Sequence, residues 1–216
     1  MQSTHISRVN GKLIELTSGD ITRYDTQLIV VPTNIDFGYD RDMPSVQGAI
    51  VRAAGTKPFE EAIEKAKKIA QEKGIVRFRE MDYDGFVQPF QGVITDGGRL
   101  NGRSLLHLVS KNFIGNKGPE DRCIVFPDGS YVDYIAVRES TRSALNLAHA
   151  NGFDTVAFPA LGAGMYGVPI EESVEDMVGE FVEHLIKDQS VKRIGLILYG
   201  ESNYHSGLAT FKRASL

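Results

Sequence analysis

The chain has 216 residues, of which 42% are hydrophobic and 24% are charged, a composition that excludes a fibrous, coiled-coil or wholly disordered protein. With 24 basic and 28 acidic residues and one cysteine, the sequence also excludes an internal disulfide, a multi-cysteine zinc site and a basic field for long nucleic acid. No run of about 18 apolar residues and no signal peptide are evident, so we expect a cytoplasmic protein without a membrane partner.

Along the chain, short apolar runs rich in β-branched residues alternate with longer amphipathic segments. The apolar runs predict strands at Lys12–Leu16, Leu28–Val31, Leu105–Val109, Thr155–Phe158 and Arg193–Tyr199. The amphipathic segments predict helices at Pro58–Glu72, Asp133–Ala150 and Ile170–Lys187. This alternation predicts an α/β protein, a three-layer α/β/α sandwich with a mixed, largely parallel central sheet.

Two segments fit the alternation poorly. Gly74–Gly98 is β-prone but contains Pro89, which favours an edge strand or a hairpin over a central strand. Gly115–Gly129 is rich in Gly, Pro and Asp, with a short strand expected at Cys123–Phe126. We therefore expect one domain over residues 1–216, with surface excursions near 75–98 and 115–130.

Two loops join a predicted strand to a predicted helix, the setting in which α/β proteins bind ligands. Pro32–Gln47 leads into GAIVRAAG, and PALGAGMYG leads into the helix at Ile170. In the second loop, Gly162 and Gly164 permit positive φ and close approach of backbone N–H groups to a phosphate. The alternative is a plain connector whose glycines only permit a tight turn.

Four motifs, taken together, resemble the macrodomain family. FPALGAGMYGVP at Phe158–Pro169 resembles that family's ligand loop, usually close to FPAISTGIYGYP, and GDIT at Gly19–Thr22 matches its N-terminal signature. LIVVPTN, which ends at Asn34, resembles IVNAAN, and GAIVRAAG at Gly48–Gly55 resembles GAIHRAAG. With the strand LLHLVS, the resemblance keeps the family's order and spacing from Gly19 to about Phe211.

The resemblance implies a cleft for ADP-ribose or ADP-ribosylated protein, with no cofactor and no metal. It implies the following ligand-binding residues: Asp20, Ile21, Asn34, Ser45, Val46, Gln47, Gly162, Ala163, Gly164, Met165, Tyr166 and Tyr199.

Within this set, the resemblance gives Asp20 the adenine amino group and Ile21 the adjacent backbone contact. Asn34 lies near the distal ribose and is the candidate catalytic residue. Tyr199 is a candidate for stacking on the adenine, with Tyr204 as a substitute. Two alternatives stay open, since Asp20 also suits a helix or turn cap and Tyr199 also suits the core.

The first loop departs from the family. Where macrodomains commonly have three glycines, this chain has Met43, Pro44 and Ser45, so one backbone donor is missing and unstrained positive φ is lost at two positions. The loop also carries three acidic residues that would repel a diphosphate unless they point to solvent or bind a cation, and we expect them to be solvated: Asp36, Asp40 and Asp42.

Hydrolytic members of the family have an aspartate in this loop where this chain has Gln47, and an amide cannot act as a general base. Turnover would then depend on a water held by Asn34 and the substrate phosphate, or on a loop aspartate. We expect binding of ADP-ribose or a derivative with hydrolysis, either of protein-linked ADP-ribose or of a phosphate or acetyl group on the free nucleotide. The alternatives are a non-catalytic reader module and, less favoured by the net charge, an RNA-associated nucleotide binder. His107, inside an apolar run, is expected to be a core histidine.

Overall fold

The computed structural model describes residues 3–34, 37–72, 78–80, 83–85, 91–110, 123–125, 131–133, 135–164, 166–187 and 190–216. Its centre is a seven-stranded sheet, whose strands lie in the spatial order β1 (Thr4–Val9), β2 (Lys12–Ser18), β11 (Arg193–Leu198), β10 (Thr155–Pro159), β3 (Leu28–Thr33), β7 (Ser104–Val109) and β6 (Gly92–Asp96). The strands β2, β11, β10, β3 and β7 are parallel, and the edge strands β1 and β6 are antiparallel to their neighbours. This is the predicted mixed, largely parallel sheet.

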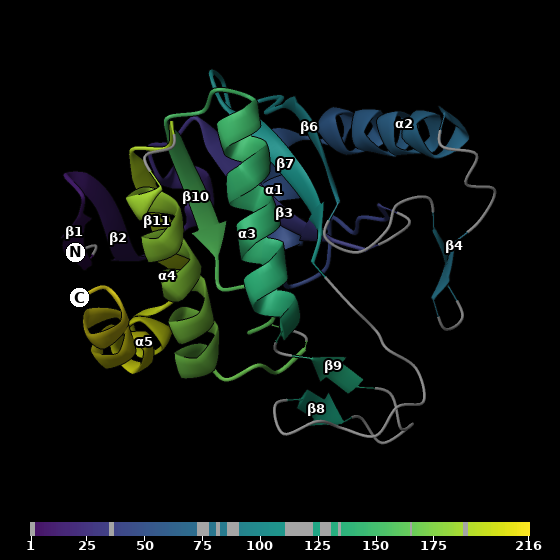
Figure 1. Cartoon of the computed structure of the whole chain (residues 1–216). Helices are drawn as coiled ribbons and strands as arrows, with labels where there is room; N and C mark the ends of the chain where they lie inside the picture. Colours follow the sequence, from purple (N-terminus) through teal and green to yellow (C-terminus); the bar gives the residue numbers. More distant parts are fainter. Residues whose placement is uncertain are drawn as a thin grey trace.

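Helices cover both faces of the sheet (Figure 1). One layer consists of α3 (Ile135–Ala150), α4 (Ile170–Ile186) and α5 (Glu201–Ala214). The opposite layer consists of α1 (Val46–Ala54), α2 (Lys57–Glu72) and the short 3-10 helix η1 (Ile21–Arg23). Because side chains alternate along a strand, Leu28 and Val30 of β3 pack toward the first layer, and Ile29 and Val31 pack toward the second. Two small hairpins complete the chain: β4 (Phe78–Glu80) with β5 (Tyr83–Gly85), and β8 (Cys123–Val125) with β9 (Tyr131–Asp133).

The predicted strands and helices are confirmed, with differences at their ends. The helix expected from Asp133 begins at Ile135, since Asp133 ends β9. The edge-strand expectation for 74–98 is confirmed at β6, while Pro89 lies outside the described residues. The short strand at 123 is confirmed as β8, and residues 115–122 lie outside the described residues. The strand β1 and the helix α5 were not predicted.

The order in which the chain adds strands to the sheet reverses between β3 and β10, which are hydrogen-bonded neighbours at its centre. From β3 the chain continues through α1 and α2 toward β7 on one side, whereas from β10 it continues through α4 to β11 on the other. In open α/β sheets, ligands bind outside the carboxyl ends of the strands at such a switch point. The fold thus places the two candidate loops side by side.

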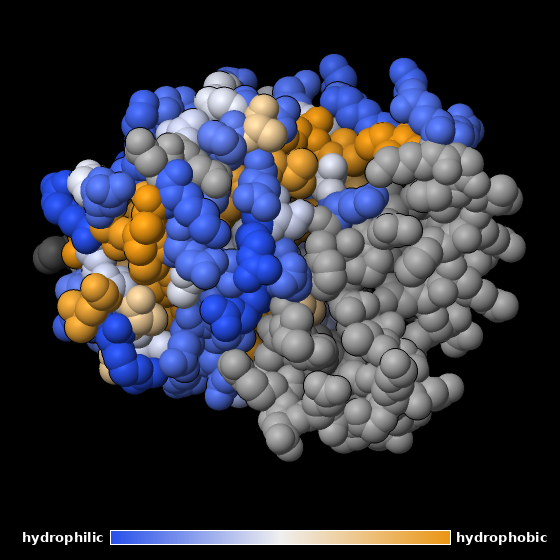
Figure 2. Space-filling model, in the orientation of Figure 1, coloured by the Kyte–Doolittle hydropathy of each residue, from blue (hydrophilic) through white to orange (hydrophobic). Residues whose placement is uncertain are grey.

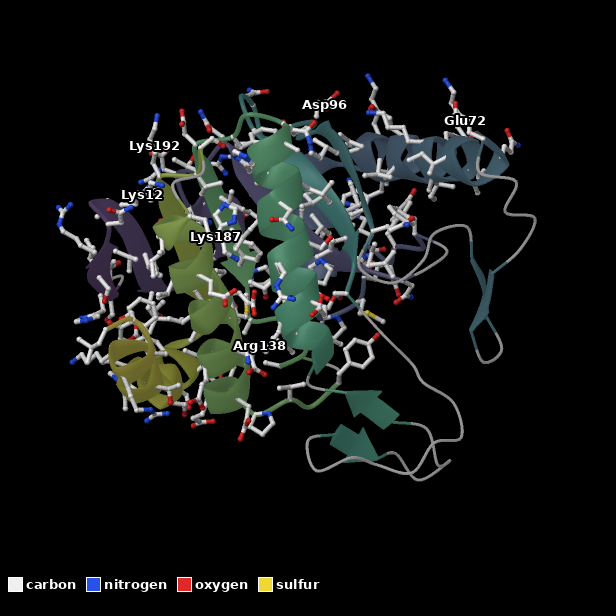
Figure 3. The ribbon with its side chains drawn as sticks, viewed as in Figure 1. Lys12, Glu72, Asp96, Arg138, Lys187 and Lys192 are labelled. Atoms are coloured by element: carbon white, nitrogen blue, oxygen red, sulfur yellow. The ribbon has the colours of Figure 1, made fainter. Side chains whose placement is uncertain are left out.

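A buried carboxylate on α4 bonds to two arginines of α3. Glu180, only 2% exposed, accepts from Arg142 Nε and Nη2 at 2.9 Å each and from Arg138 Nε at 3.2 Å. Arg138 lies toward the end of α3 nearest the β8–β9 hairpin, whereas Lys192 and Asp96 lie at the opposite end of the sheet (Figure 3). Figure 2 shows that the outer surface of these two helices is largely hydrophilic. Among the described helices, none is long and apolar enough to cross a membrane.

Candidate functional site

Four segments that carry predicted site residues follow four consecutive parallel strands at one edge of the sheet. Asp20 follows β2, Tyr199 follows β11, the glycine-rich loop follows β10 and Asn34 follows β3. Gly19 N donates to Leu198 O at 2.9 Å and so joins the first two segments directly. The structure therefore brings residues from 20 to 199 to the carboxyl ends of neighbouring strands, next to the switch point between β10 and β3.

Asp20 caps η1, as the alternative interpretation anticipated. Its Oδ1 accepts from Thr22 N at 2.9 Å and from Thr22 Oγ1 at 2.8 Å. Its Oδ2 lies 3.8 Å from Nε of the exposed Arg23, and the Asp20 side chain is 39% exposed. Capping occupies one oxygen and leaves the other at the surface, so the cap and a ligand contact are compatible. The Ile21 side chain is buried against α1, so the expected contact of this residue is limited to its backbone.

Tyr199 and Tyr204 have opposite environments. The Tyr199 side chain is 81% exposed, which rules out the core alternative. Its carbonyl oxygen accepts from Asn203 Nδ2 at 2.9 Å, which fixes the turn into α5. Tyr204, on the inner side of α5, is buried in the core, so the expectation that it substitutes for Tyr199 at a ligand is wrong.

Loop 2, residues 160–169, has a base anchored in the core. Leu161 is buried; its N–H points at Met177 Sδ at 3.4 Å, and its carbonyl accepts from Ser173 Oγ at 2.9 Å. Gly162 has φ +76°, and a Cβ there would lie 2.7 Å from Val168 Cγ2. The first glycine therefore permits both the turn and close packing.

The outer part of loop 2 is exposed at Gly164. Gly164 is exposed and its carbonyl accepts from Gly167 N at 3.0 Å, while Val168 N donates to Gly162 O at 3.1 Å. Gly164 is not among the described residues with positive φ, which corrects that part of the expectation, but a Cβ there would meet nothing within 4 Å. Ala163 and Tyr166 are half-buried, and Met165 lies outside the described residues.

Loop 1, residues 34–45, is hydrogen-bonded to the side chain of Gln47, which lies in the first turn of α1. Gln47 Nε2 donates to Gly38 O at 3.2 Å and to Thr33 Oγ1 at 3.4 Å, which ties the start of α1 to the end of β3. Asp40 and Asp42 are exposed, as predicted, and Asp40 Oδ1 accepts from Asp42 N at 2.8 Å. The prediction for Asp36 lies outside the described residues.

The substitution of the usual glycines changes which N–H groups loop 1 can offer. Asp42 N and Ser45 N are already bonded, to Asp40 and to Met43 O, and Pro44 has no N–H. Ser45 caps α1, its Oγ accepting from Gly48 N at 3.1 Å. Val46 and Gln47 are the first two residues of α1, where backbone N–H groups have no intrahelical partner.

Other polar groups and cavities lie elsewhere. His107 is buried, with Nε2 3.0 Å from Thr95 Oγ1, and burial lowers its pKa to about 3, with a smaller contribution from Lys65. The expectation of a satisfied core histidine is confirmed.

A cavity of about 390 Å³ beside β6 is lined by Lys65 and Lys68, but Lys65 Nζ donates to Ile94 O at 2.9 Å and protects the sheet edge.

Comparison with known proteins gives consistent matches over most of the chain. A family model described as "Macro domain" matches residues 41–177. An O-acetyl-ADP-ribose deacetylase of Cronobacter turicensis is 28% identical over 191 residues, which cover 88% of this chain and 91% of that protein. An uncharacterized protein of Pyrobaculum aerophilum is 30% identical over 205 residues, which cover 95% of this chain and 94% of that protein.

Solved structures agree in fold. The macrodomain of Oceanobacillus iheyensis, solved with ADP, aligns with a TM-score of 0.75 at 22% identity, covering 99% of this chain and 97% of that one. The macrodomain of Trypanosoma brucei in complex with ADP-ribose aligns with a TM-score of 0.65 at 22% identity, covering 93% of this chain and 68% of that one.

Proposed function

The chain belongs to the Macro domain family, and from this premise we propose that it binds ADP-ribose at the carboxyl edge of its sheet and hydrolyses an ester-linked derivative of that nucleotide. The observation that carries the proposal is the alignment of Asp20, Tyr199, loop 2 and Asn34 along four consecutive parallel strands. An extended dinucleotide-like ligand needs its base, phosphate and sugar contacts in a row. In this proposal, Asp20 and Tyr199 contact the base, loop 2 contacts the phosphates and Asn34 contacts the sugar.

In this arrangement the adenine lies at the β2–β11 end. The outer oxygen of Asp20 accepts from the adenine amino group, and the exposed ring of Tyr199 stacks on the base. The diphosphate lies between loop 2 and the first turn of α1, where the N–H groups of Val46 and Gln47 and the helix dipole favour negative charge. The distal ribose lies beside Asn34.

The proposed reaction is hydrolysis of an acyl ester on the distal ribose. Water adds to the ester carbonyl carbon, the bond between that carbon and the ribose oxygen breaks, and the products are a carboxylic acid and ADP-ribose. Asn34 holds the water. Because Gln47 cannot act as a base, the substrate phosphate takes the proton of this water and passes it to the ribose oxygen as that oxygen leaves. The name of the Cronobacter relative supports an acetyl ester as one substrate.

A second function, recognition of ADP-ribose without turnover, is favoured by one observation. Gln47 stands where hydrolytic relatives have an acid, and its amide nitrogen is committed to Gly38 and Thr33. A reader needs the same cleft and no base. Binding therefore cannot separate the two functions, and product release can.

The test is a calorimetric titration with ADP-ribose followed by product assays on O-acetyl-ADP-ribose and on protein carrying ester-linked ADP-ribose. We expect saturable binding and release of ADP-ribose from at least one ester. Binding with no product from either substrate would leave the reader function standing. No binding at millimolar ligand would overturn both functions.

A further inference from the structure

Arg52, on the exposed side of α1, donates hydrogen bonds to the backbone of loop 1. Its Nη1 donates to Arg41 O at 2.5 Å and lies 3.4 Å from Met43 O. Hydrogen bonds from a guanidinium to backbone carbonyls are charge-assisted and are stronger than neutral ones. One side chain therefore holds the carbonyls on both sides of Asp42.

Gly48, one helical turn before Arg52, lets the backbone of loop 1 pack closely against α1. A Cβ on Gly48 would lie 2.2 Å from Met43 O and 3.2 Å from Arg52 Nη1, so the Met43 carbonyl occupies the space of the missing side chain. The same carbonyl accepts from Ser45 N at 2.8 Å. Loop 1 is thus seated on α1 by Gly48 and held there by Arg52.

Arg99 fixes the other end of the same helix. Its Nη2 donates to Arg52 O at 2.5 Å and its Nε to Ala53 O at 3.3 Å, while Arg99 N donates to Ala54 O at 2.9 Å. These contacts satisfy carbonyls that a helix end leaves unpaired. The helix that carries Arg52 is therefore anchored independently of loop 1.

We infer that Arg52 is a positioning residue for the ligand site: it holds the 41–43 segment so that the first turn of α1 stays open to the diphosphate and distal ribose. Loop 1 lacks the glycines usual in the family, and the hydrogen bonds from Arg52 hold its backbone in one conformation. The inference rests on the proposed function and deepens it. Arg52 acts only on the phosphate and distal-ribose half of the site, because Asp20 and Tyr199 follow other strands.

The experiment compares calorimetric affinities for ADP-ribose and for AMP in the wild type and three variants. AMP carries the adenine end of the ligand with one phosphate, and it lacks the second phosphate and the distal ribose. Arg52→Ala removes the hydrogen bonds to Arg41 O and Met43 O. Arg52→Lys keeps the charge without the forked geometry of the guanidinium. Arg8→Ala, the control, removes an exposed arginine from β1 at the opposite end of the sheet. Thermal unfolding of each variant reports the fold.

We expect Arg52→Ala to weaken ADP-ribose binding about tenfold and AMP binding less than about twofold, and Arg52→Lys to recover only part of the loss. Arg8→Ala should bind both ligands like the wild type. Equal losses for both ligands, no loss for ADP-ribose, or full recovery by Arg52→Lys would overturn the inference. Failure of the wild type to bind ADP-ribose would instead overturn the proposed function.

Discussion

Gln47 donates its side-chain amide to the carbonyl oxygen of Gly38 at 3.2 Å, across the turn that follows β3. A carbonyl oxygen only accepts, so this contact fixes the amide nitrogen toward the loop. Gln47, which the family resemblance places at the position of an acid, is therefore hydrogen-bonded to the backbone of loop 1. A substitution of Gln47 is expected to change the free energy of unfolding and the rate of hydrolysis, and the two effects can be measured separately.

Gln47→Asp should raise the rate of ester hydrolysis, because it supplies the general base that the natural loop lacks, with little change in ADP-ribose affinity. It should also lower the free energy of unfolding by about 1 kcal/mol, since a carboxylate cannot donate to Gly38 O. Single-turnover assays and urea unfolding measure the two effects. Gln47→Glu, which keeps the side-chain length, is the control for the lost donor. An unchanged rate in a folded, binding variant would reject the need for an acid.

Asp20 caps η1 and is proposed to contact the adenine, and one pair of variants separates the two roles. Asp20→Ala should weaken ADP-ribose binding roughly ten- to a hundredfold and also destabilise the fold by about 1 kcal/mol, because the bond to Thr22 N is lost. Asp20→Asn keeps a good cap but presents an amide whose outer group donates, so it should lose affinity and keep stability. Calorimetry and thermal unfolding provide both readouts. Wild-type affinity in Asp20→Asn would remove Asp20 from the adenine contact.

The two glycines of loop 2 should respond in opposite ways. Gly164→Glu should abolish ligand binding with little effect on the fold, because a side chain there enters open space and brings negative charge to the phosphate position. Gly162→Ala should destabilise the protein by roughly 1 to 3 kcal/mol, since its Cβ would overlap Val168 and its φ is +76°. Titration with ADP-ribose and denaturant unfolding distinguish the two. Retained affinity in Gly164→Glu would make loop 2 a simple connector.

His107 should make stability depend on pH. Its pKa is lowered to about 3 in the folded protein, so between that value and the usual value near 6.5 the unfolded chain binds more protons. The free energy of unfolding should therefore rise with pH through this window, and the stabilisation is complete above it and lost as the pH falls. His107→Gln should reduce the slope between pH 4 and 6 by up to about 1.4 kcal/mol per pH unit. Identical slopes in urea titrations of both proteins would contradict the assignment.

The sheet and its helices could be predicted because burial leaves a clear pattern in the sequence. The runs at β3, β10 and β11 are apolar on both faces, as strands covered by helices must be. The strand β1 was missed because it has no apolar face: Ile6 lies on its exposed side, and His5 and Ser7 lie on its half-buried side. The helix α5 was missed because it follows β11 after only two residues and contains a glycine, Gly207, that packs against Leu198.

The candidate site was predicted in part, for a different reason. The order of the strands places Asp20, Asn34, loop 2 and Tyr199 at one edge, and motif spacing carried enough information to nominate them. The contacts of Gln47 and Arg52 with loop carbonyls could not be predicted, because they depend on the conformation of a loop whose sequence departs from the family pattern. Long polar side chains that bond to backbone leave no periodic signal.

The most direct test of the proposed ligand path is a crystal structure of the protein with ADP-ribose bound. We predict that the adenine lies beside Asp20 and Tyr199, the diphosphate between Gly164 and the first turn of α1, and the distal ribose beside Asn34. The nucleotide would thus follow the carboxyl ends of β2, β11, β10 and β3 in order. A nucleotide bound in the reverse direction, or in the cavity lined by Lys65 and Lys68 beside β6, would contradict this path.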